Sequence, residues 1–326
     1  METPRTLQAA IEYFADADRA HNYMVAKRWP NGVACPTCGQ VEPRYLAKRR
    51  IFECKSKHER RQFSVKVGTI FEDSPIALKS WLLAVWMVAN CKNGVSSYEV
   101  ARSIGVTQKS AWFMLHRIRL AMQDDNNGGG KFAGEVEVDE TYIGGKARNM
   151  HAAKRKALMS STTNQQGKPS KFNRWAGKVA VLGLLERNAD GTSRVRTMPI
   201  ENVRQHKLHG HIREQVAEGS TVYTDALQSY RGLTGFAHET IDHADAYVRG
   251  NVHTNGLESY WSLLKRSLRG TYISVEPFHL FRYLDEQSFR FNNRKQSDGE
   301  RFDATLSTVT GRRLTYDKLT GREVAA

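Results

Sequence analysis

The chain has 326 residues, 40% of them hydrophobic and 25% charged, which suits two or three globular domains and excludes an intrinsically disordered chain. Lys and Arg total 49 against 34 Asp and Glu, so the formal net charge is +15, which favours a polyanionic partner over a charge that serves solubility alone. No apolar run approaches the roughly 18 residues needed to span a bilayer, and the N-terminus carries acids that a secretory signal lacks. A cytoplasmic protein with no membrane partner is therefore predicted.

Helical patterns and short, turn-rich segments alternate in the first 124 residues. Apolar residues recur at helical spacing over 6–29, 76–90 and 96–123, which predicts helices there. Residues 30–70 form short segments interrupted by turns and hold three of the four cysteines. The Gly-rich stretch 124–131, DDNNGGGK, is typical of a linker. This half of the chain is predicted to contain a helical segment 1–29, a metal-binding ribbon 30–72, a helical region 73–124 and a linker 125–133.

Strand and helix patterns are mixed after the linker. Strands are predicted over 135–145, 178–187, 193–200 and 220–226. Helices are predicted over 206–219, 253–268 and 277–293. The mixture indicates an α/β domain over 134–295, in which the polar, aperiodic residues 147–173 form a mobile insertion. The C-terminal tail, 296–326, carries little pattern and is expected to be partly disordered.

The cysteine cluster has the spacing of a zinc site. Cys35 and Cys38 form a C-x-x-C knuckle, and Cys54 follows 16 positions later, in the range expected for the second half of a zinc ribbon. Lys57 stands where a fourth cysteine is usual, so His58 is the nearest candidate for the fourth ligand, with a water or another residue as the alternative. One structural Zn²⁺ per chain is predicted.

Residues 96–123 have the anatomy of a helix-turn-helix. Ser96 or Ser97 can cap a first helix, Gly105 makes the turn, and Thr107 can cap the second helix. A plain helical hairpin would look the same, but the net charge and the zinc knuckle favour DNA binding. The face of the second helix expected to contact DNA carries Lys109, His116, Arg117 and Arg119.

Three acidic residues stand where an α/β fold could gather them. Asp139 and Asp225 each lie at the end of a predicted strand, and carboxylates at neighbouring strand ends can bind a hard cation together. Glu258 begins a predicted helix, and Lys265 lies seven residues further on, about two turns along the same face. An acid for metal and a base for phosphate on one helix fit a nucleic-acid enzyme.

Several blocks of the sequence resemble a known family. VDETYIGGK, VYTDALQSYRGL, HTNGLESYWSLLKRSLRGTY and HLFRYLDEQSFRFNNR are similar to the catalytic blocks of bacterial insertion-sequence DDE transposases of the ISXO-like group. CPTCG followed by FSVKVGTIFEDS resembles the N-terminal zinc ribbon of the same group. The resemblance covers roughly residues 30–295.

The resemblance implies an RNase H-like α/β catalytic domain, a mixed sheet flanked by helices, behind a zinc ribbon and an all-α helix-turn-helix. It also implies a DDE triad of Asp139, Asp225 and Glu258 that holds two Mg²⁺ (or Mn²⁺) ions. Some relatives have Asn at the third position, and Asn255 lies one turn before Glu258, so Asn255 is a second candidate. We expect Asn255 to cap the helix and Glu258 to bind metal, because a carboxylate binds Mg²⁺ more strongly than an amide does.

The function expected from these features is transposition. The enzyme would bind the terminal inverted repeats of a mobile element as double-stranded DNA, cut them and join them to target DNA, acting as a homo-oligomer in the bacterial cytoplasm. Lys265 and Arg266 would hold phosphate near the cut. The alternative is a zinc-ribbon, helix-turn-helix regulator that binds DNA and whose transposase-derived domain is inactive.

Overall fold

The computed structural model describes residues 3–123, 130–145, 151–153, 156, 177–188, 192–241 and 252–322. The chain divides into two compact units, which are described separately below. The first unit comprises Met1–Gln123 with Asn293–Ala326, and the second comprises Asp124–Asn292. The predicted mobile insertion at 147–173 lies almost wholly outside the described residues.

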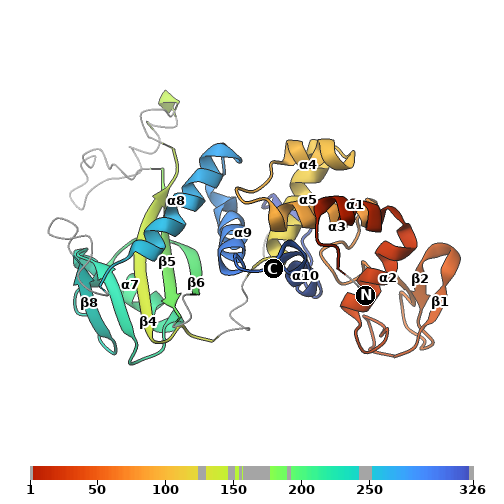
Figure 1. The fold of residues 1–326 in the computed structure, drawn as a ribbon, viewed down its shortest axis with the longest axis horizontal. Helices are drawn as coiled ribbons and strands as arrows, with labels where there is room; N and C mark the ends of the chain where they lie inside the picture. The colour runs from red at the N-terminus through yellow and green to blue at the C-terminus, as the bar shows by residue number, and fades with distance from the viewer. Residues whose placement is uncertain are drawn as a thin grey trace. The chain divides into compact units, whose positions relative to one another are not determined.

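Helices make up most of the first unit (Figure 1). They include α1 (Leu7–Ala15), α2 (Ala17–Arg28), α3 (Leu78–Asn90), α4 (Ser97–Ile104) and α5 (Gln108–Ala121). Side chains at the N-termini satisfy backbone N–H groups that a helix leaves unpaired: Asp16 caps α2, and Ser96 caps α4 in a reciprocal capping box with Glu99. The helices predicted in this region are confirmed.

A three-stranded antiparallel sheet carries the cysteine-rich segment. Its strands β1 (Arg44–Leu46), β2 (Ile51–Glu53) and β3 (Gln62–Ser64) pair in chain order, with a 3-10 turn η1 (Ala47–Arg49) between the first two. Phe52 and Phe63 stack across β2 and β3 with ring centroids 5.6 Å apart. Cys35 and Cys54 are buried beside these rings. The small core of this sheet therefore contains two of the expected metal ligands.

The C-terminal residues form part of the first unit, contrary to the prediction of a patternless tail. They contain helices α10 (Asp298–Ser307) and α11 (Tyr316–Leu319). Phe302 of α10 is fully buried, and its ring lies 5.8 Å from Phe14 and 5.1 Å from Trp86. Ser297 and Glu300 form a capping box at the start of α10, which is a sequence signal that could have identified this helix.

The second unit is built on a five-stranded mixed sheet. Its strands are β4 (Glu135–Ile143), β5 (Val179–Arg187), β6 (Ser193–Ile200), β7 (Thr221–Asp225) and β8 (Ala237–Ile241). The spatial order is β6-β5-β4-β7-β8; β4, β5 and β6 are antiparallel neighbours, whereas β7 is parallel to both β4 and β8. The expected α/β organisation, with a mixed sheet flanked by helices, is confirmed.

Helices complete the second unit. They are α7 (Gln205–Gln215), α8 (Asn255–Gly270) and α9 (Leu280–Asn292), with 3-10 turns η3 (Gln228–Tyr230) and η4 (Pro277–His279). Figure 1 shows α8 lying across the sheet. The predicted linker 125–133 ends earlier than expected, because Phe132 is fully buried in this unit and its N–H donates to Gln215 O.

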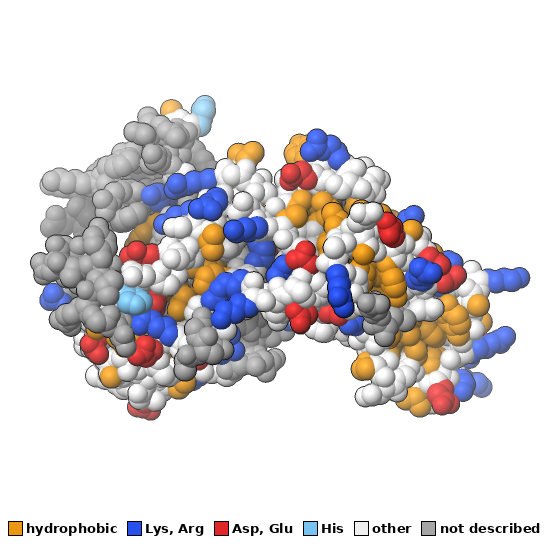
Figure 2. Space-filling model, viewed as in Figure 1, with side chains coloured by type: hydrophobic (Ala, Val, Ile, Leu, Met, Phe, Trp, Pro, Cys, Tyr) orange, Lys and Arg blue, Asp and Glu red, His pale blue; other side chains and the backbone are white. Residues whose placement is uncertain are grey.

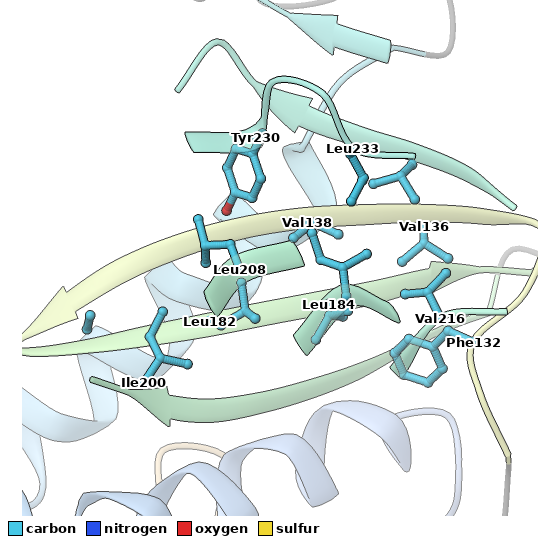
Figure 3. Packing of buried hydrophobic residues seen from close by; sticks show 13 residues of the cluster. Phe132, Val136, Val138, Leu182, Leu184, Ile200, Leu208, Val216, Tyr230 and Leu233 are labelled. Carbon is cyan, nitrogen blue, oxygen red and sulfur yellow. The ribbon is translucent and has the colours of Figure 1, made fainter. Parts of the chain in front are cut away.

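The two faces of the sheet have separate cores, because strand side chains alternate between faces. Val136 and Val138 pack with Leu208 of α7 in the cluster drawn in Figure 3. The other cluster joins Leu185 of β5 to residues of α8 and α9. Odd-numbered residues of β4, Asp139 among them, therefore face α8. In the described part of the chain, no helix is long and apolar enough to cross a membrane.

Candidate active site

The predicted zinc ligands come together in the first unit. The ligand atoms of Cys35, Cys38, Cys54 and His58 all lie within 4.8 Å of one another. Cys35 Sγ is 3.5 Å from His58 Nε2, and Cys38 Sγ is 3.6 Å from Cys54 Sγ. Ligands about 2.3 Å from a tetrahedral ion would lie about 3.8 Å apart, so this group of four fits one Zn²⁺. His58, and not Lys57, stands at the fourth position.

The electrostatics of the cluster favour thiolate. Burial raises the pKa of the Cys35 thiol, but the backbone N–H groups of Cys38 and Thr37 outweigh burial and bring this pKa down to about 6. His58 donates from Nδ1 to the carbonyl of Glu59, 2.5 Å away, which leaves Nε2 on the side of the cysteines. A hydrogen bond of this kind fixes the orientation of a metal-binding imidazole.

The two aspartates lie side by side in the second unit. The parallel register of β4 and β7 pairs Glu137 with Tyr223, and two residues further along both strands stand Asp139 and Asp225. Both strands run in the same direction, and a step of two residues keeps each side chain on the same face of the sheet. Both aspartates are half-buried and face α8.

The pKa of Asp139 is shifted from its ordinary value. Burial raises its pKa to about 6, and the charges of Asp225 and Glu258 act in the same direction. Trp261 opposes this shift, because its indole Nε1 donates a hydrogen bond of 2.8 Å to Asp139 Oδ2. The three predicted acids are therefore close enough to repel one another.

Glu140, the next residue of β4, is a fourth acid near the aspartates, on the opposite face of the sheet from Asp139. Its Oε2 accepts a 2.7 Å hydrogen bond from the hydroxyl of Tyr230, which is fully buried. Burial raises the pKa of Glu140 to about 7, and the charges of Asp225 and Asp139 add to the effect. Among the described residues, only Cys35, Cys38, Cys54 and His58 form a group of three or more possible metal ligands whose ligand atoms lie close together. As a group, the carboxylate oxygens of the acids are therefore further from one another than the ligand atoms of the zinc group are.

Helix α8 presents Glu258 and Lys265 to this centre. Glu258 is exposed in the first turn of the helix, and Lys265 is half-buried two turns later. Burial and the nearby Arg269 lower the pKa of Lys265, whereas Asp139 raises it. Arg266 is exposed on the same helix, and Figure 2 shows Lys and Arg side chains gathered over α8.

The start of α8 differs from the prediction. The N-cap residue is Thr254, which makes no side-chain capping bond, and Asn255 is an exposed residue of the first turn. The buried carboxylate of Glu137 accepts from the N–H of Leu257 at 2.9 Å and takes over the capping role expected of Asn255. Arg187 donates to Glu137 Oε1 at 2.8 Å, so the capping charge is itself paired.

Comparison with known proteins agrees with the resemblance in the sequence. The family model described as the ISXO2-like transposase domain matches residues 131–292, and the one described as the transposase zinc-ribbon domain matches residues 15–58. A protein of Halobacterium salinarum, described as an uncharacterized protein in transposable element ISH50, is 30% identical over 267 residues, which cover 79% of this chain and 85% of the relative. This chain belongs to the ISXO2-like transposases. No solved structure matches it significantly.

The two matched regions of this ISXO2-like transposase fall in different units. The zinc-ribbon match spans α2 and the strands β1 and β2, and it ends at His58. The transposase-domain match runs through the whole sheet to the end of α9, and it includes the four acids and Lys265.

The predicted DNA-contacting face of α5 is wrong for three of its four residues in the transposase. Only Lys109 is exposed; His116, Arg117 and Arg119 are 0%, 5% and 1% exposed. Arg117 donates to the carbonyls of Ile70, Glu72 and Leu314, which lie in two other segments of the first unit. These basic residues are buried because α5 is a central helix of its unit.

Proposed function

We propose that this ISXO2-like transposase is an active DDE-type enzyme that cuts and joins DNA at the ends of its element. The observation that carries the proposal is the arrangement of three acids: Asp139 and Asp225 stand side by side on neighbouring strands, and the charge of Glu258 reaches Asp139. Three acids brought together from two strands and a helix are costly for a structural role, because burial first, and then the charges of Asp225 and Glu258, disfavour the ionised form of Asp139.

The fold supports this assignment. We propose that the second unit is RNase H-like: its first three strands are antiparallel neighbours, and two parallel strands follow on the other side of β4. We also propose that α4 and α5 form a DNA-binding helix-turn-helix. Gly105 ends α4 in the left-handed conformation at φ 70°, Thr107 caps α5, and the exposed first turns of α5 carry Lys109.

The donor set of the centre fits magnesium. Carboxylate oxygens are the ligands that Mg²⁺ prefers, and a cation would favour the ionised form of Asp139, whose pKa is raised by burial and by the charges of Asp225 and Glu258. Asp139, Asp225 and Glu258 would hold the two ions that the family resemblance implies. Bound Mg²⁺ would supply Lewis acidity, which lowers the pKa of an attacking water or 3′-hydroxyl and stabilises the leaving oxygen. Zn²⁺ would be structural, in the closed Cys35, Cys38, Cys54 and His58 site.

The remaining side chains act on DNA and on the acids themselves. Lys265, beside Asp139, would contact a phosphate oxygen next to the scissile bond, and the exposed Arg266 a neighbouring phosphate. Trp261 donates to one carboxylate oxygen of Asp139 and so orients the carboxylate for metal binding. The net charge of +15 supports a long contact with double-stranded DNA, and a homo-oligomer would be needed to hold two element ends together.

The second candidate function is a DNA-binding regulator whose catalytic domain is inactive. The retention of all three acids together with Lys265 disfavours it. The deciding experiment incubates the full-length protein with candidate element ends and Mg²⁺ and maps nicks on both strands. We expect cleavage at the element boundary that disappears when Mg²⁺ is omitted and in Asp139→Asn. DNA binding without any metal-dependent nick, in the wild type, would favour the regulator.

A further inference from the structure

We propose that a pocket beside the acidic centre binds one unpaired nucleotide of the DNA strand that is cut. The proposal rests on the proposed function and specifies the form of the substrate: the DNA next to the scissile phosphate is not fully paired when it is bound. The pocket has a volume of about 390 Å³. That size falls within the range of sites for small organic ligands, roughly 300–1,000 Å³.

Three elements of the second unit line this pocket. The end of β4 contributes Ile143 and the following glycines, and α8 contributes Lys265, Leu268 and Arg269 from its C-terminal half. The segment after α8 closes the pocket with Ile273 and its neighbours. The pocket adjoins the acidic centre, because Lys265 lies one helical turn after Trp261, which is bonded to Asp139, and Ile143 follows Asp139 on β4.

The pocket is cationic on its α8 side. Lys265 and Arg269 both line it and repel one another, and Lys178 adds to this repulsion. Among the described residues, Asp139 is the acid that favours the charged form of Lys265. An anion that enters between these side chains would relieve the repulsion, and the anion that DNA offers is a phosphodiester.

Apolar side chains also line the pocket, namely Ile143 at the end of β4, Leu268 of α8 and Ile273 after α8. Leu268 belongs to the core between α8 and the sheet and Ile143 packs against it, whereas Ile273 is 82% exposed. Ile273 also has a positive φ of 59°, a conformation that is unfavourable for a β-branched residue. An exposed apolar side chain held in a strained conformation at the rim of a pocket is a common sign of a binding role.

A nucleotide matches both sets of side chains at once, with its phosphate at Lys265 and Arg269 and its base against Ile273. A paired base cannot enter, because its faces are covered by stacking and its edge by the complementary strand. An unpaired base has free faces and can leave the helix for a few kcal/mol at most. The occupant is therefore an unpaired nucleotide.

The test compares two DNA probes with the full-length protein in buffer without added Mg²⁺ and without chelator, so that the zinc ribbon keeps its metal. One probe is a fluorescently labelled duplex, and the other is the same duplex with a single unpaired thymidine. We expect the wild type to bind the second probe on the order of tenfold more tightly. Ile273→Asn and Arg269→Ala should each remove this preference. Asn tolerates a positive φ, so the first variant should unfold at no lower temperature than the wild type.

Lys207→Ala is the matched control, because Lys207 is a surface cation on α7, which packs against the other face of the sheet. It should keep the preference. Equal wild-type affinity for both probes would overturn the pocket assignment and leave DNA binding intact. A preference that survives in Ile273→Asn and Arg269→Ala would also overturn it. A protein that binds neither probe would contradict the proposed function as well.

Discussion

Trp261 and Asp139 are joined by a hydrogen bond of 2.8 Å between the indole Nε1 and Oδ2 of the carboxylate. Gly183 makes this contact possible, because it pairs with Asp139 across β4 and β5 and has no side chain toward α8. A Cβ at position 183 would lie 2.5 Å from Cζ2 of Trp261. The carboxylate that we assign to metal binding is therefore oriented by a ring that fits only above a glycine.

Trp261→Phe should impair catalysis while the fold is kept. Phe preserves most of the packing but cannot donate to Asp139, and a hydrogen bond to a charged group contributes about 1.5–3 kcal/mol. We expect cleavage to slow by on the order of tenfold to a hundredfold, and the pKa of Asp139 to rise. The pH profile of single-turnover cleavage should move to higher pH, which loss of packing alone would not cause. An unshifted profile would show that the indole is structural.

Gly183→Ala tests the same contact from the other side. The added methyl group collides with Trp261, so we expect a loss of about 1–3 kcal/mol in the free energy of unfolding, as in other overpacked cores. Combining it with Trp261→Leu should restore part of that stability but not cleavage. Urea unfolding of Gly183→Ala, Trp261→Leu and the double variant would measure these changes in the free energy of unfolding.

Substitutions of Glu258 and of Asn255 should have clearly different effects on cleavage. Glu258→Gln should abolish cleavage and leave DNA binding intact, because the charge of Glu258 reaches Asp139. Asn255→Ala should change the free energy of unfolding by less than about 0.5 kcal/mol, since Glu137 and not Asn255 caps α8. Cleavage assays and urea melts on both variants check this. A Glu258→Gln protein that cuts normally beside a dead Asn255→Ala would assign the third position to Asn255.

Removal of zinc should unfold only the ribbon. Elemental analysis should find one Zn²⁺ per chain, and His58→Ala should weaken its retention, because His58 lies within 4.8 Å of the three cysteines. Chelation should unfold β1–β3, whose core contains Cys35 and Cys54, and leave the second unit folded. Circular dichroism and limited proteolysis would follow both units. Full zinc occupancy in His58→Ala would exclude that residue as a ligand.

The burial of α5 changes what mutations there should do. Lys109→Glu should weaken DNA binding and reduce the salt dependence of binding, because Lys109 is exposed. The fold should be kept, although the substitution removes the contact between Lys109 Nζ and the ring of Tyr316, whose centroid is 4.7 Å away. Arg119→Glu should instead destabilise the first unit by several kcal/mol, because it places an acid at a site that is 1% exposed. Thermal melts with DNA-binding titrations distinguish the two. A stable Arg119→Glu protein would contradict the packing of α5.

Stability should depend on pH in a direction set by Asp139 and Glu140. Their pKa values in the folded protein, about 6 and about 7, lie above the ordinary values of about 3.9 and 4.3. The folded state therefore binds more protons than the unfolded state between about pH 4 and pH 7, and the contribution of these groups to the free energy of unfolding falls as pH rises through that window. Mg²⁺ favours the charged carboxylates, so it should raise the melting temperature more at pH 8 than at pH 5. Equal stabilisation at both pH values, or the same effect in Asp139→Asn with Asp225→Asn, would contradict the assignment.

Periodicity and spacing were enough to predict most of the elements and the zinc ligands. The strands β4 to β7, the helices α3 to α5 and the C-x-x-C knuckle are local features, because a repeat of 2 or 3.6 residues or a fixed loop spacing is visible within one segment. Asp139, Asp225 and Glu258 could be predicted as site residues because each lies at the end of a predicted strand or at the start of a predicted helix.

Only the tertiary structure decided which polar residues are buried and what they contact. A basic residue on a helix is usually solvated, so Arg117 and Arg119 looked like DNA contacts, but both are buried. Arg117 donates to the carbonyls of Ile70 and Leu314, which lie nearly 50 and 200 residues away in the sequence. The cap of α8 likewise comes from Glu137, 120 residues before Leu257, and the orientation of Asp139 comes from Trp261, 122 residues after it. Local patterns cannot report such contacts, because the partner of a buried charge or an unpaired N–H is chosen by which strands and helices pack together.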